Sequence, residues 1–481
     1  MVAVLTNPTG RYYDTHNLYY FVSLKYAKSL LKKSWVSKQA IFWLEQILAE
    51  RFGVLITLRL YDCFIQLFIS GSDYFIEVFT DPIVFIRTDS DLPVILCNLP
   101  EDMIALNGRT IFAVGISTLQ QTLIEKTDRG YRINYDILGL TYWMLSRQEE
   151  VGRTDLDEHG RFPATASHAF KNGYLERPIV DEWLDILGQV MLRVWPGIKL
   201  KQHHFNMKVS HDVDAPTRYG YKSFSGIVRS MGANLLKKGD VKQALLAPLI
   251  RLNSCNMLHP QDPFNTFDWI MDFSEQHAMQ SAFYFICGRT HRQYDADYEL
   301  EAPAIRNLLR RIHYRGHEIG LHPSYNTWQN PHSLAIEAER LKKVCGEEGI
   351  VQSEWGGRMH FLRWEHPTTM LGWEMAVMNY DSTLGYADRP GFRCGTCFEY
   401  PAFDPVNLKM LNLRIRPLIA MECTIMADRY MGLGAGLAAF EKFVALKNTC
   451  KAVNGSFTLL WHNSQLTSAA ERVLYQSVLN A

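Results

Sequence analysis

Two aspartates stand two residues apart at the end of a short apolar run. Asp212 and Asp214 follow residues 205–209, whose pattern predicts a strand. On an extended backbone, residues two apart point to the same side, so the two carboxylates should lie close together. Close carboxylates repel each other unless a cation or a proton neutralises one of them. This spacing favours Asp214 as a metal ligand and Asp212 as the general base for a water molecule. An aspartate turn or a helix cap before residues 215–216 is the plainer alternative.

A histidine ends another short apolar run. His322 follows the predicted strand 318–321 and is a candidate imidazole ligand, although a lone histidine is more often a hydrogen-bonded core residue. His317 lies five residues earlier, so on one strand it would face the opposite side and should not share a metal with His322. We therefore expect His322 to be functional and His317 to be structural.

The elements that must position these residues indicate a parallel α/β fold, because short apolar runs alternate with helical patterns from residue 205 onward. Strands are predicted at 205–209, 282–286, 318–321 and 457–461, with a helix over 334–344. The polar residues that follow these strands are Asp212, Asp214, His322 and His462. Active sites of parallel α/β barrels and open sheets lie at the carboxyl ends of the strands, so we expect these side chains to meet.

The first 200 residues carry a different pattern and no motif with evident chemistry. A helix is predicted around residues 43–48, strands at 64–79, and a second helix after Pro178. Because 481 residues exceed one typical hydrophobic core, we predict an α+β N-terminal domain at 1–200 and a second domain at 201–481.

The composition excludes several classes of protein. The chain has 50 basic and 50 acidic residues, whereas nucleic-acid binders need a surplus of Lys and Arg. No uncharged apolar stretch approaches the roughly 18 residues of a membrane span. Residues 1–11 lack the basic-then-apolar pattern of a secretion signal. Nine cysteines, an odd number, do not indicate a disulfide scaffold. We expect a cytoplasmic globular protein with no nucleic-acid partner and no membrane span; these features do not predict its oligomeric state.

The order of the motifs in residues 205–481 resembles that of the polysaccharide deacetylases of the NodB-homology type. The motifs are Ser-His-Asp-Val-Asp at 210–214, Gly-His-Glu-Ile-Gly-Leu-His at 316–322, Arg358, and Leu-Trp-His-Asn at 460–463. Within that superfamily the chain is similar to the branch from bacterial surface-polysaccharide gene clusters, whose members carry an additional N-terminal domain. The stretches that resemble the signature of that domain are 145–150, 160–163 and 177–181.

This resemblance implies a distorted (β/α) barrel after the N-terminal domain, and metal-dependent removal of an N- or O-acetyl group from a sugar. It implies Asp212 as the general base and Asp214 as the first metal ligand. His322 matches the first histidine of the family's His-x-x-x-His pair. His462 matches the late histidine that protonates the leaving group.

One position departs from the family pattern. The second metal histidine of the family falls four residues after His322, where this chain has Asn326. An amide oxygen can bind a hard cation but is a poor zinc ligand beside an imidazole. The predicted ligands of a divalent metal, with zinc expected, are therefore Asp214, His322 and Asn326. A ligand supplied by His332 or His360, or the absence of a metal, is the alternative.

Further residues are predicted to position the catalytic pair and to contact substrate. By the same resemblance, Arg358 orients Asp212, and Asp381 holds His462 in its productive orientation. Arginines near the site can pair with a carboxylate or phosphate of the substrate, with structural pairing as the alternative. The predicted substrate contacts are Tyr325, Arg363, Arg393 and Glu422.

We therefore expect a carbohydrate deacetylase-like hydrolase that acts on carbon–nitrogen bonds other than peptides. Its partner would be an acetylated sugar, an oligosaccharide or a nucleotide sugar. One alternative is a metal-free carbohydrate-binding relative, which Asn326 favours. The other is an amide hydrolase for a non-sugar C–N bond, because the same chemistry serves both substrates.

Overall fold

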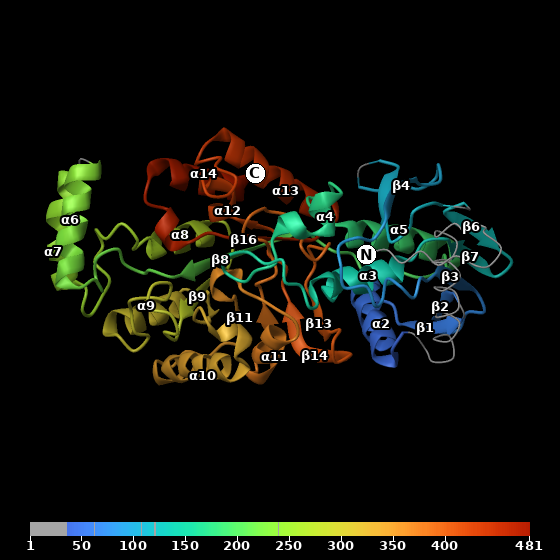
Figure 1. Cartoon of the computed structure of the whole chain (residues 1–481), viewed down its shortest axis with the longest axis horizontal. Coiled ribbons are helices and arrows are strands. Elements are labelled where there is room, and N and C mark those ends of the chain that lie inside the picture. The colour runs from blue at the N-terminus through green and yellow to red at the C-terminus, as the bar shows by residue number, and fades with distance from the viewer. Residues whose placement is uncertain (1–35, 62, 107, 120–121, 239) are drawn as a thin grey trace, which may run out of the picture.

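The computed structural model describes residues 36–61, 63–106, 108–119, 122–238 and 240–481, and its fold is mixed α/β (Figure 1).

The N-terminal part combines short strands with helices. Its elements are α2 (Lys38–Phe52), β1 (Ile56–Tyr61), β2 (Phe64–Ile69), β3 (Phe75–Phe79), β4 (Val94–Asn98), β5 (Thr110–Val114), β6 (Ile124–Thr127), β7 (Gly130–Ile133), α3 (Ile137–Leu145), α4 (His168–Lys171) and α5 (Ile179–Val194). A five-stranded sheet has the order β1-β2-β3-β7-β6, and β4 pairs with β5. The helices predicted around 43–48 and after Pro178 are confirmed as α2 and α5, and the strands predicted at 64–79 as β2 and β3.

The C-terminal part is built around a mostly parallel sheet. Its strands are β8 (Asn206–Val213), β9 (Ser281–Ile286), β10 (Glu318–His322), β11 (Gly356–Gly357), β12 (Tyr380–Asp381), β13 (Tyr400–Asp404), β14 (Lys409–Ile415), β15 (Ala420–Met421) and β16 (Ser456–Leu460). They form a nine-stranded sheet in the order β13-β14-β12-β11-β10-β9-β8-β16-β15. Only the β13–β14 pair of this order is antiparallel. The four strands predicted from the sequence are confirmed as β8, β9, β10 and β16.

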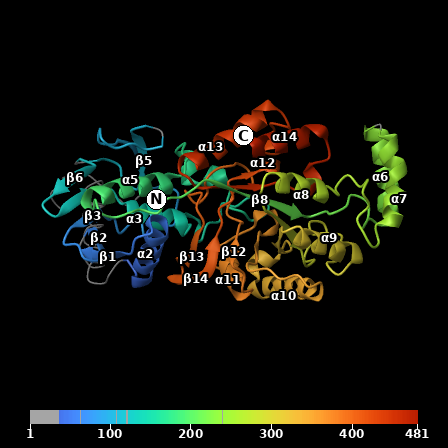
Figure 2. The ribbon, with the colours of Figure 1, turned by 180° about the vertical axis from the view of Figure 1, so that it is seen from behind.

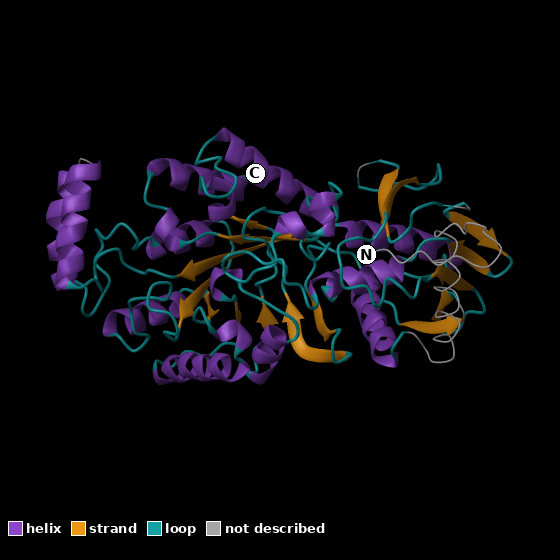
Figure 3. Cartoon of the chain, in the orientation of Figure 1, coloured by secondary structure: helices purple, strands orange, loops and turns teal. Residues whose placement is uncertain are grey.

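Helices surround this sheet, as Figures 1 and 3 show. They are α8 (Phe267–Gln276), α9 (Pro303–Tyr314), α10 (Pro331–Glu347), α11 (Thr368–Met375), α12 (Glu422–Met426), α13 (Leu437–Ala452) and α14 (Ala469–Asn480). All six residues of β9 are buried, as expected for a parallel strand covered on both faces. Within the described ranges, no helix is both long enough and apolar enough to cross a membrane.

The two parts are in direct contact through α2. The indole N–H of Trp43 donates to the carbonyl oxygen of Pro401 at 2.8 Å, and its ring stacks on Phe403 at 5.0 Å. The two large sheets nevertheless lie on opposite sides of residue 200 in the sequence. The division into domains 1–200 and 201–481 stays a prediction.

The strand order brings polar residues to one edge of the sheet. Asp212 is the second-last residue of β8, His322 ends β10, and His462 comes two residues after β16. β16 and β9 both pair with β8, and β10 pairs with β9. Because these strands are parallel, their carboxyl ends share one edge, where α/β proteins bind ligands.

Candidate active site

A cavity of about 220 Å³ lies at the carboxyl ends of these strands. Its lining includes Asp212, Asp214, His322, His360 and His462. The structure therefore brings together the four residues that follow strands in the sequence. It adds His360, which comes three residues after β11.

Three imidazoles converge on the carboxylate of Asp214. Nε2 of His322 lies 3.2 Å, and Nε2 of His360 lies 3.7 Å, from Oδ1 of Asp214. Nε2 of His462 lies 3.6 Å from the other oxygen, Oδ2. Oδ1 is buried and has no hydrogen-bond partner in the part of the chain that the structure describes. A buried carboxylate oxygen without a partner is costly, so it points to a cation or donor that binds there.

The other ring nitrogen of each imidazole, Nδ1, forms a hydrogen bond to an oxygen atom. Nδ1 of His322 lies 2.6 Å from the carbonyl oxygen of Arg358, and Nδ1 of His360 lies 3.2 Å from Oδ1 of Asp295. Nδ1 of His462 lies 2.5 Å from Oε1 of Glu422. Since carbonyl and carboxylate oxygens accept, each Nδ1 donates, and each Nε2 is directed toward Asp214.

Asp214, His322 and His360 form a set of side chains that fits a divalent metal. Their ligand atoms all lie within 4.8 Å of one another. One carboxylate and two imidazoles are the donor types that zinc and other divalent transition metals take. The unpartnered Oδ1 of Asp214 faces both imidazoles, which is the arrangement that an ion between them would satisfy.

Asp295 orients one member of this set. Besides His360, it accepts hydrogen bonds from the backbone N–H groups of Thr290, His291 and Tyr325 at 2.7 to 2.8 Å. Burial by itself would raise the pKa of Asp295, but His360 and the backbone N–H groups of Tyr325 and His291 lower it below its usual value. The carboxylate is therefore ionised and can hold Nδ1 of His360, as the second ligand shell of metal sites does.

The side chain of Asn326 does not face Asp214. Its Nδ2 donates to the carbonyl oxygen of Thr290 at 3.0 Å, and its Oδ1 accepts from Nη1 of Arg363 at 3.2 Å. Both ends of the predicted amide ligand are thus engaged away from Asp214, on an exposed residue. His360 occupies the place that the sequence motif suggested for Asn326, because the turn after β11 delivers it to the same edge of the sheet. The other alternative, His332, lies exposed in the first turn of α10.

Asp212 lies beside this set in an ion pair. Its Oδ1 accepts from Nη1 of Arg358 at 2.8 Å, and its Oδ2 lies 3.7 Å from Nε2 of His322. Arg358 is fully buried, and its other nitrogens donate to the carbonyl oxygen of Ser382 and to the hydroxyls of Ser382 and Ser210. Arg358 therefore fixes one oxygen of Asp212 and leaves the other facing the cavity.

The carboxylate that holds His462 is Glu422, not Asp381. Asp381 instead accepts from the backbone N–H and the hydroxyl of Thr383, and burial raises the pKa of Asp381 to about 6. Its strand, β12, is separated from β16 by four other strands. Glu422 directly follows β15, which pairs with β16, so it reaches His462 from the neighbouring strand.

His462 is held in its protonated form. Burial alone would lower the pKa of the His462 imidazole, but Glu422 raises it well above its usual value. Glu422, Cys423 and His462 also have possible ligand atoms within 4.8 Å of one another. Burial, and then Glu422, raise the pKa of the Cys423 thiol, so it is not the thiolate that binds metals. We therefore treat Glu422 and His462 as a carboxylate–imidazolium pair.

Three of the predicted substrate contacts have structural partners. Arg393 forms two hydrogen bonds to Glu150, at 2.9 and 2.6 Å, and is 2% exposed. Arg363 donates to the carbonyl oxygens of His159 and Tyr325 and lies over the ring of Tyr325. The hydroxyl of Tyr325 in turn lies 2.8 Å from Nδ1 of His159. These contacts join the N-terminal part to the C-terminal part, which the sequence pattern around each residue could not reveal.

Other side chains line the mouth of the cavity. Arg161 donates to Asp157, to the carbonyl oxygen of Phe361 and to the hydroxyl of Tyr430. Arg429 is exposed and lies over the ring of Tyr430 at 4.8 Å. Arg161 belongs to one of the N-terminal stretches singled out in the sequence. That part of the chain therefore contributes to the site.

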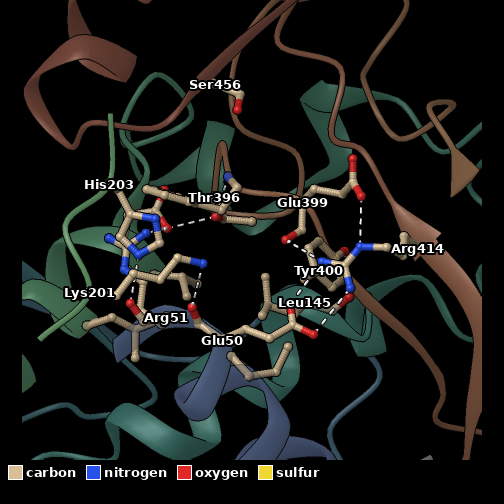
Figure 4. Close-up of a pocket in the computed structure, with 15 residues that line it drawn as sticks. Glu50, Arg51, Leu145, Lys201, His203, Thr396, Glu399, Tyr400, Arg414 and Ser456 are labelled. Carbon is tan, nitrogen blue, oxygen red and sulfur yellow. Dashed lines mark hydrogen bonds and ion pairs between the residues drawn. The ribbon is translucent and has the colours of Figure 1, made fainter. Parts of the chain in front are cut away.

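A second cavity of about 230 Å³ lies between α2, α5 and the strands β13 and β14 (Figure 4). Its polar groups are largely engaged with one another. Arg414 pairs with Glu50 and Glu399, and Nζ of Lys201 donates to the carbonyl oxygen of Glu50 at 3.4 Å. His203 bonds the carbonyl oxygen of Arg51. This cavity belongs to the contact between the two parts of the chain, whereas the converging imidazoles lie in the first.

Comparison with known proteins assigns no function to the chain. The model of a family of unknown function, DUF7033, matches residues 66–196, which is well under half of the chain. A search of curated proteins found no significant match.

Two solved structures are similar over part of the chain. One is a Mycobacterium smegmatis protein assigned as a polysaccharide deacetylase, with 16% identity and a TM-score of 0.36 over 58% of this chain and 84% of that one. The other is Puue allantoinase, with 11% identity and a TM-score of 0.34 over 60% of this chain and 85% of that one. At these identities and TM-scores, neither structure supports a conclusion about the site of this chain.

Proposed function

We propose that this chain is a metal-dependent hydrolase that removes an acetyl group from a nitrogen or oxygen of a sugar. The observation that carries the proposal is the convergence of three Nε2 atoms on Asp214 beside the ion-paired Asp212. In the same proposal, residues 201–481 form a distorted barrel around the parallel strands, with residues 1–200 as a separate domain.

In this proposal, Asp214, His322 and His360 hold the metal ion. When bound, the ion supplies a Lewis acid that polarises an acyl oxygen and favours ionisation of water. Oδ2 of Asp212 takes the proton of the attacking water, because Arg358 already engages Oδ1. Nε2–H of the His462 imidazolium donates a proton to the leaving nitrogen or oxygen. The bond between the acyl carbon and that atom breaks, and acetate and the free amine or hydroxyl are released.

The two proton-transfer groups, Asp212 and His462, lie near different oxygens of Asp214. Oδ2 of Asp212 lies 3.7 Å from Nε2 of His322, which approaches Oδ1 of Asp214, whereas His462 approaches Oδ2. An acyl group bound between them would have the water on the Asp212 side and the leaving atom on the His462 side. This separation is what hydrolysis of an amide or ester requires, because base and acid act on different atoms.

The metal-free alternative rested on Asn326. It loses that support because His360 offers an imidazole in place of the amide. An amide hydrolase for a non-sugar substrate uses the same groups, so the identity of the acyl acceptor separates it from the sugar deacetylase.

The test is a comparison of metal-depleted and reconstituted protein. Chelated protein would be loaded with zinc, cobalt, manganese or nickel, and acetate release would be measured from N-acetylglucosamine oligomers, UDP-N-acetylglucosamine and simple N-acetyl amines. The proposal expects acetate release from an acetylated sugar only after a metal is restored, and its loss in Asp212→Asn. Release from simple amines alone would favour the non-sugar amidase. No stoichiometric metal under any loading condition would overturn the proposal.

A further inference from the structure

The helices α6 (Phe224–Lys238) and α7 (Val241–Asn253) form a hairpin that stands apart from the rest of the molecule. They lie at the end opposite the N-terminal sheet, and both views show them separated from the helices that surround the large sheet (Figures 1 and 2). The hairpin is inserted between β8 and α8, so it follows Asp214 in the chain. We name the described residues 222–238 and 240–253 the hairpin.

The hairpin buries little of its apolar surface. Ile227, Ala247 and Ile250 form a small core with Tyr219, which precedes the hairpin, and Met231 and Leu246 pack against this core. Large apolar side chains remain in solvent along both helices: Phe224 at 84% exposure, Val228 at 55%, Leu235 at 46%, Leu236 at 89%, Val241 at 57%, Leu245 at 68%, Leu249 at 47% and Leu252 at 75%. Single exposed leucines are ordinary on protein surfaces, but a contiguous apolar surface marks an interaction site.

These side chains follow the helical repeat. Val241, Leu245, Leu249 and Leu252 are spaced by four, four and three residues, which places them in one stripe along α7. Phe224 and Val228 are spaced by four, and Leu235 follows Val228 by seven, which gives α6 its own stripe. Each helix therefore has one stripe facing its partner and another without cover in the described chain.

The hairpin is also basic, in a chain whose total charge is zero. Residues 222–253 contain six Lys or Arg residues and one acidic residue, Asp240. Asp240 accepts from the backbone N–H of Gln243 as the N-cap of α7. Arg229 and Lys242 are exposed and have no ion pair within the part of the chain that the structure describes. A surplus of positive charge next to exposed Leu, Val and Phe is typical of helices that lie in a membrane interface.

We propose that the hairpin docks on the surface of an anionic phospholipid bilayer, with its apolar side chains among the acyl chains and its basic residues at the headgroups. The charge favours this partner over a second copy of the chain, because two basic hairpins repel each other whereas anionic lipids attract both. Helices of 15 and 13 residues are shorter than the roughly 20 that a span needs, so the hairpin lies on the bilayer. Its projection from the molecule lets it reach a flat surface without the body of the protein in the way.

The hairpin also links this surface to the candidate active site. The nine residues between Asp214 and Phe224 are the connection from the end of β8 to α6. The docking itself does not depend on the proposed hydrolase activity, so the two can fail separately.

The test is sedimentation of the full-length chain with vesicles of phosphatidylcholine alone and of phosphatidylcholine mixed with phosphatidylglycerol. We expect binding to the mixed vesicles, weaker binding to the neutral ones, and a loss of binding in high salt. The variant Leu235→Ser/Leu245→Ser/Leu252→Ser should bind at least about tenfold more weakly, because it removes apolar groups of both stripes that enter the bilayer. The variant Arg229→Gln/Lys242→Gln should abolish most of the difference between the two lipid mixtures.

The matched control is Leu55→Ser/Val351→Ser, which changes two residues that are 84% and 81% exposed outside the hairpin. It should bind as the unmodified chain does. Because all the substituted positions are exposed, the circular dichroism spectra of the variants should match that of the unmodified chain. Vesicle binding by the unmodified chain tests the proposal even if a variant fails to fold. It would be overturned if the unmodified chain bound neither vesicle. It would also be overturned if light scattering showed a dimer of the unmodified chain that the leucine variant does not form, and if no chain sedimented with the vesicles.

Discussion

Nε2 of His360 lies 3.7 Å from Oδ1 of Asp214, although the two residues follow different strands of the sheet. The pair places an imidazole where the sequence motif has Asn326. Its partner on the far side, Asp295, fixes the ring through Nδ1 at 3.2 Å. The residues proposed to hold the metal therefore lie directly after β8, at the end of β10 and in the turn after β11.

The first prediction concerns the third ligand. His360→Ala should lower the affinity for zinc by about 100-fold or more, because one of three protein ligands is lost. Asn326→Ala is the matched control and should keep the affinity, since its amide bonds Thr290 and Arg363 instead. Metal content after dialysis against a graded chelator series measures both. Equal loss in the two variants would return the ligand role to Asn326.

The second prediction concerns Asp295, which forms a hydrogen bond to the proposed ligand His360. Asp295→Asn should weaken metal binding by roughly 10- to 100-fold, because the amide holds the His360 ring less firmly than the carboxylate. The same titration measures it, with thermal unfolding as the check on folding. A variant that kept the full metal affinity would show that Asp295 stabilises only the backbone N–H groups that donate to it and does not orient His360.

The third prediction separates Glu422 from Asp381. Glu422→Gln should lower kcat for acetate release by about 100-fold, because the His462 imidazolium loses the carboxylate that stabilises it. Asp381→Asn should change kcat much less, since Asp381 bonds Thr383. Steady-state kinetics on the reconstituted enzyme, with KM determined for each variant, is the measurement. The reverse ranking would restore Asp381 to the role that the sequence resemblance implied.

The fourth prediction treats Arg393 as structural. Burial alone would raise the pKa of Glu150, but Arg393 and Arg147 lower it to about 2, so the carboxylate is ionised between two arginines. Arg393→Gln should destabilise the protein by about 3–5 kcal/mol, as the removal of one partner of a buried ion pair does. Urea unfolding measures it, and metal content should be unchanged. A large rise in KM without a loss of stability would instead support contact with substrate.

The fifth prediction is a pH dependence that arises from His211 in β8. Burial lowers the pKa of His211 to about 3, whereas in the unfolded chain it is near 6.5. Between these two pH values the imidazole of His211 is protonated in the unfolded chain and neutral in the folded one. Its burial therefore costs no free energy of unfolding above pH 6.5, but it lowers the free energy of unfolding as the pH falls below that value. At pH 4.5 the loss amounts to about 3 kcal/mol.

His211→Gln is the variant for that measurement, because its amide N–H can still donate to the carbonyl oxygen of Trp461, which Nδ1 of His211 contacts at 2.6 Å. Urea unfolding at pH 7 and pH 4.5 should show a smaller loss of stability in the variant than in the unmodified chain. Equal losses would place the acid sensitivity at other titratable groups.

The sequence by itself determined four strands of the large sheet and the polar residues at the ends of three of them. Apolar periodicity predicted β8, β9, β10 and β16, because alternation and helical spacing are local properties of the chain. It also predicted that Asp212 and Asp214 point the same way and that His322 and His462 follow strands, since a parallel sheet gathers those ends.

Only the tertiary structure decided which side chains complete the site. In the proposed site, His360 takes the place predicted for Asn326 because it follows β11, which pairs with β10, the strand that His322 ends. Glu422 takes the place predicted for Asp381 because it follows β15, the neighbour of β16, whereas four strands separate β12 from β16. Sequence spacing does not contain this strand order. Arg393 pairs with Glu150 because the N-terminal part packs against the C-terminal part. Residue types and local spacing predict what a side chain can do. Its partners, and therefore its role, depend on contacts between segments that are distant in the chain.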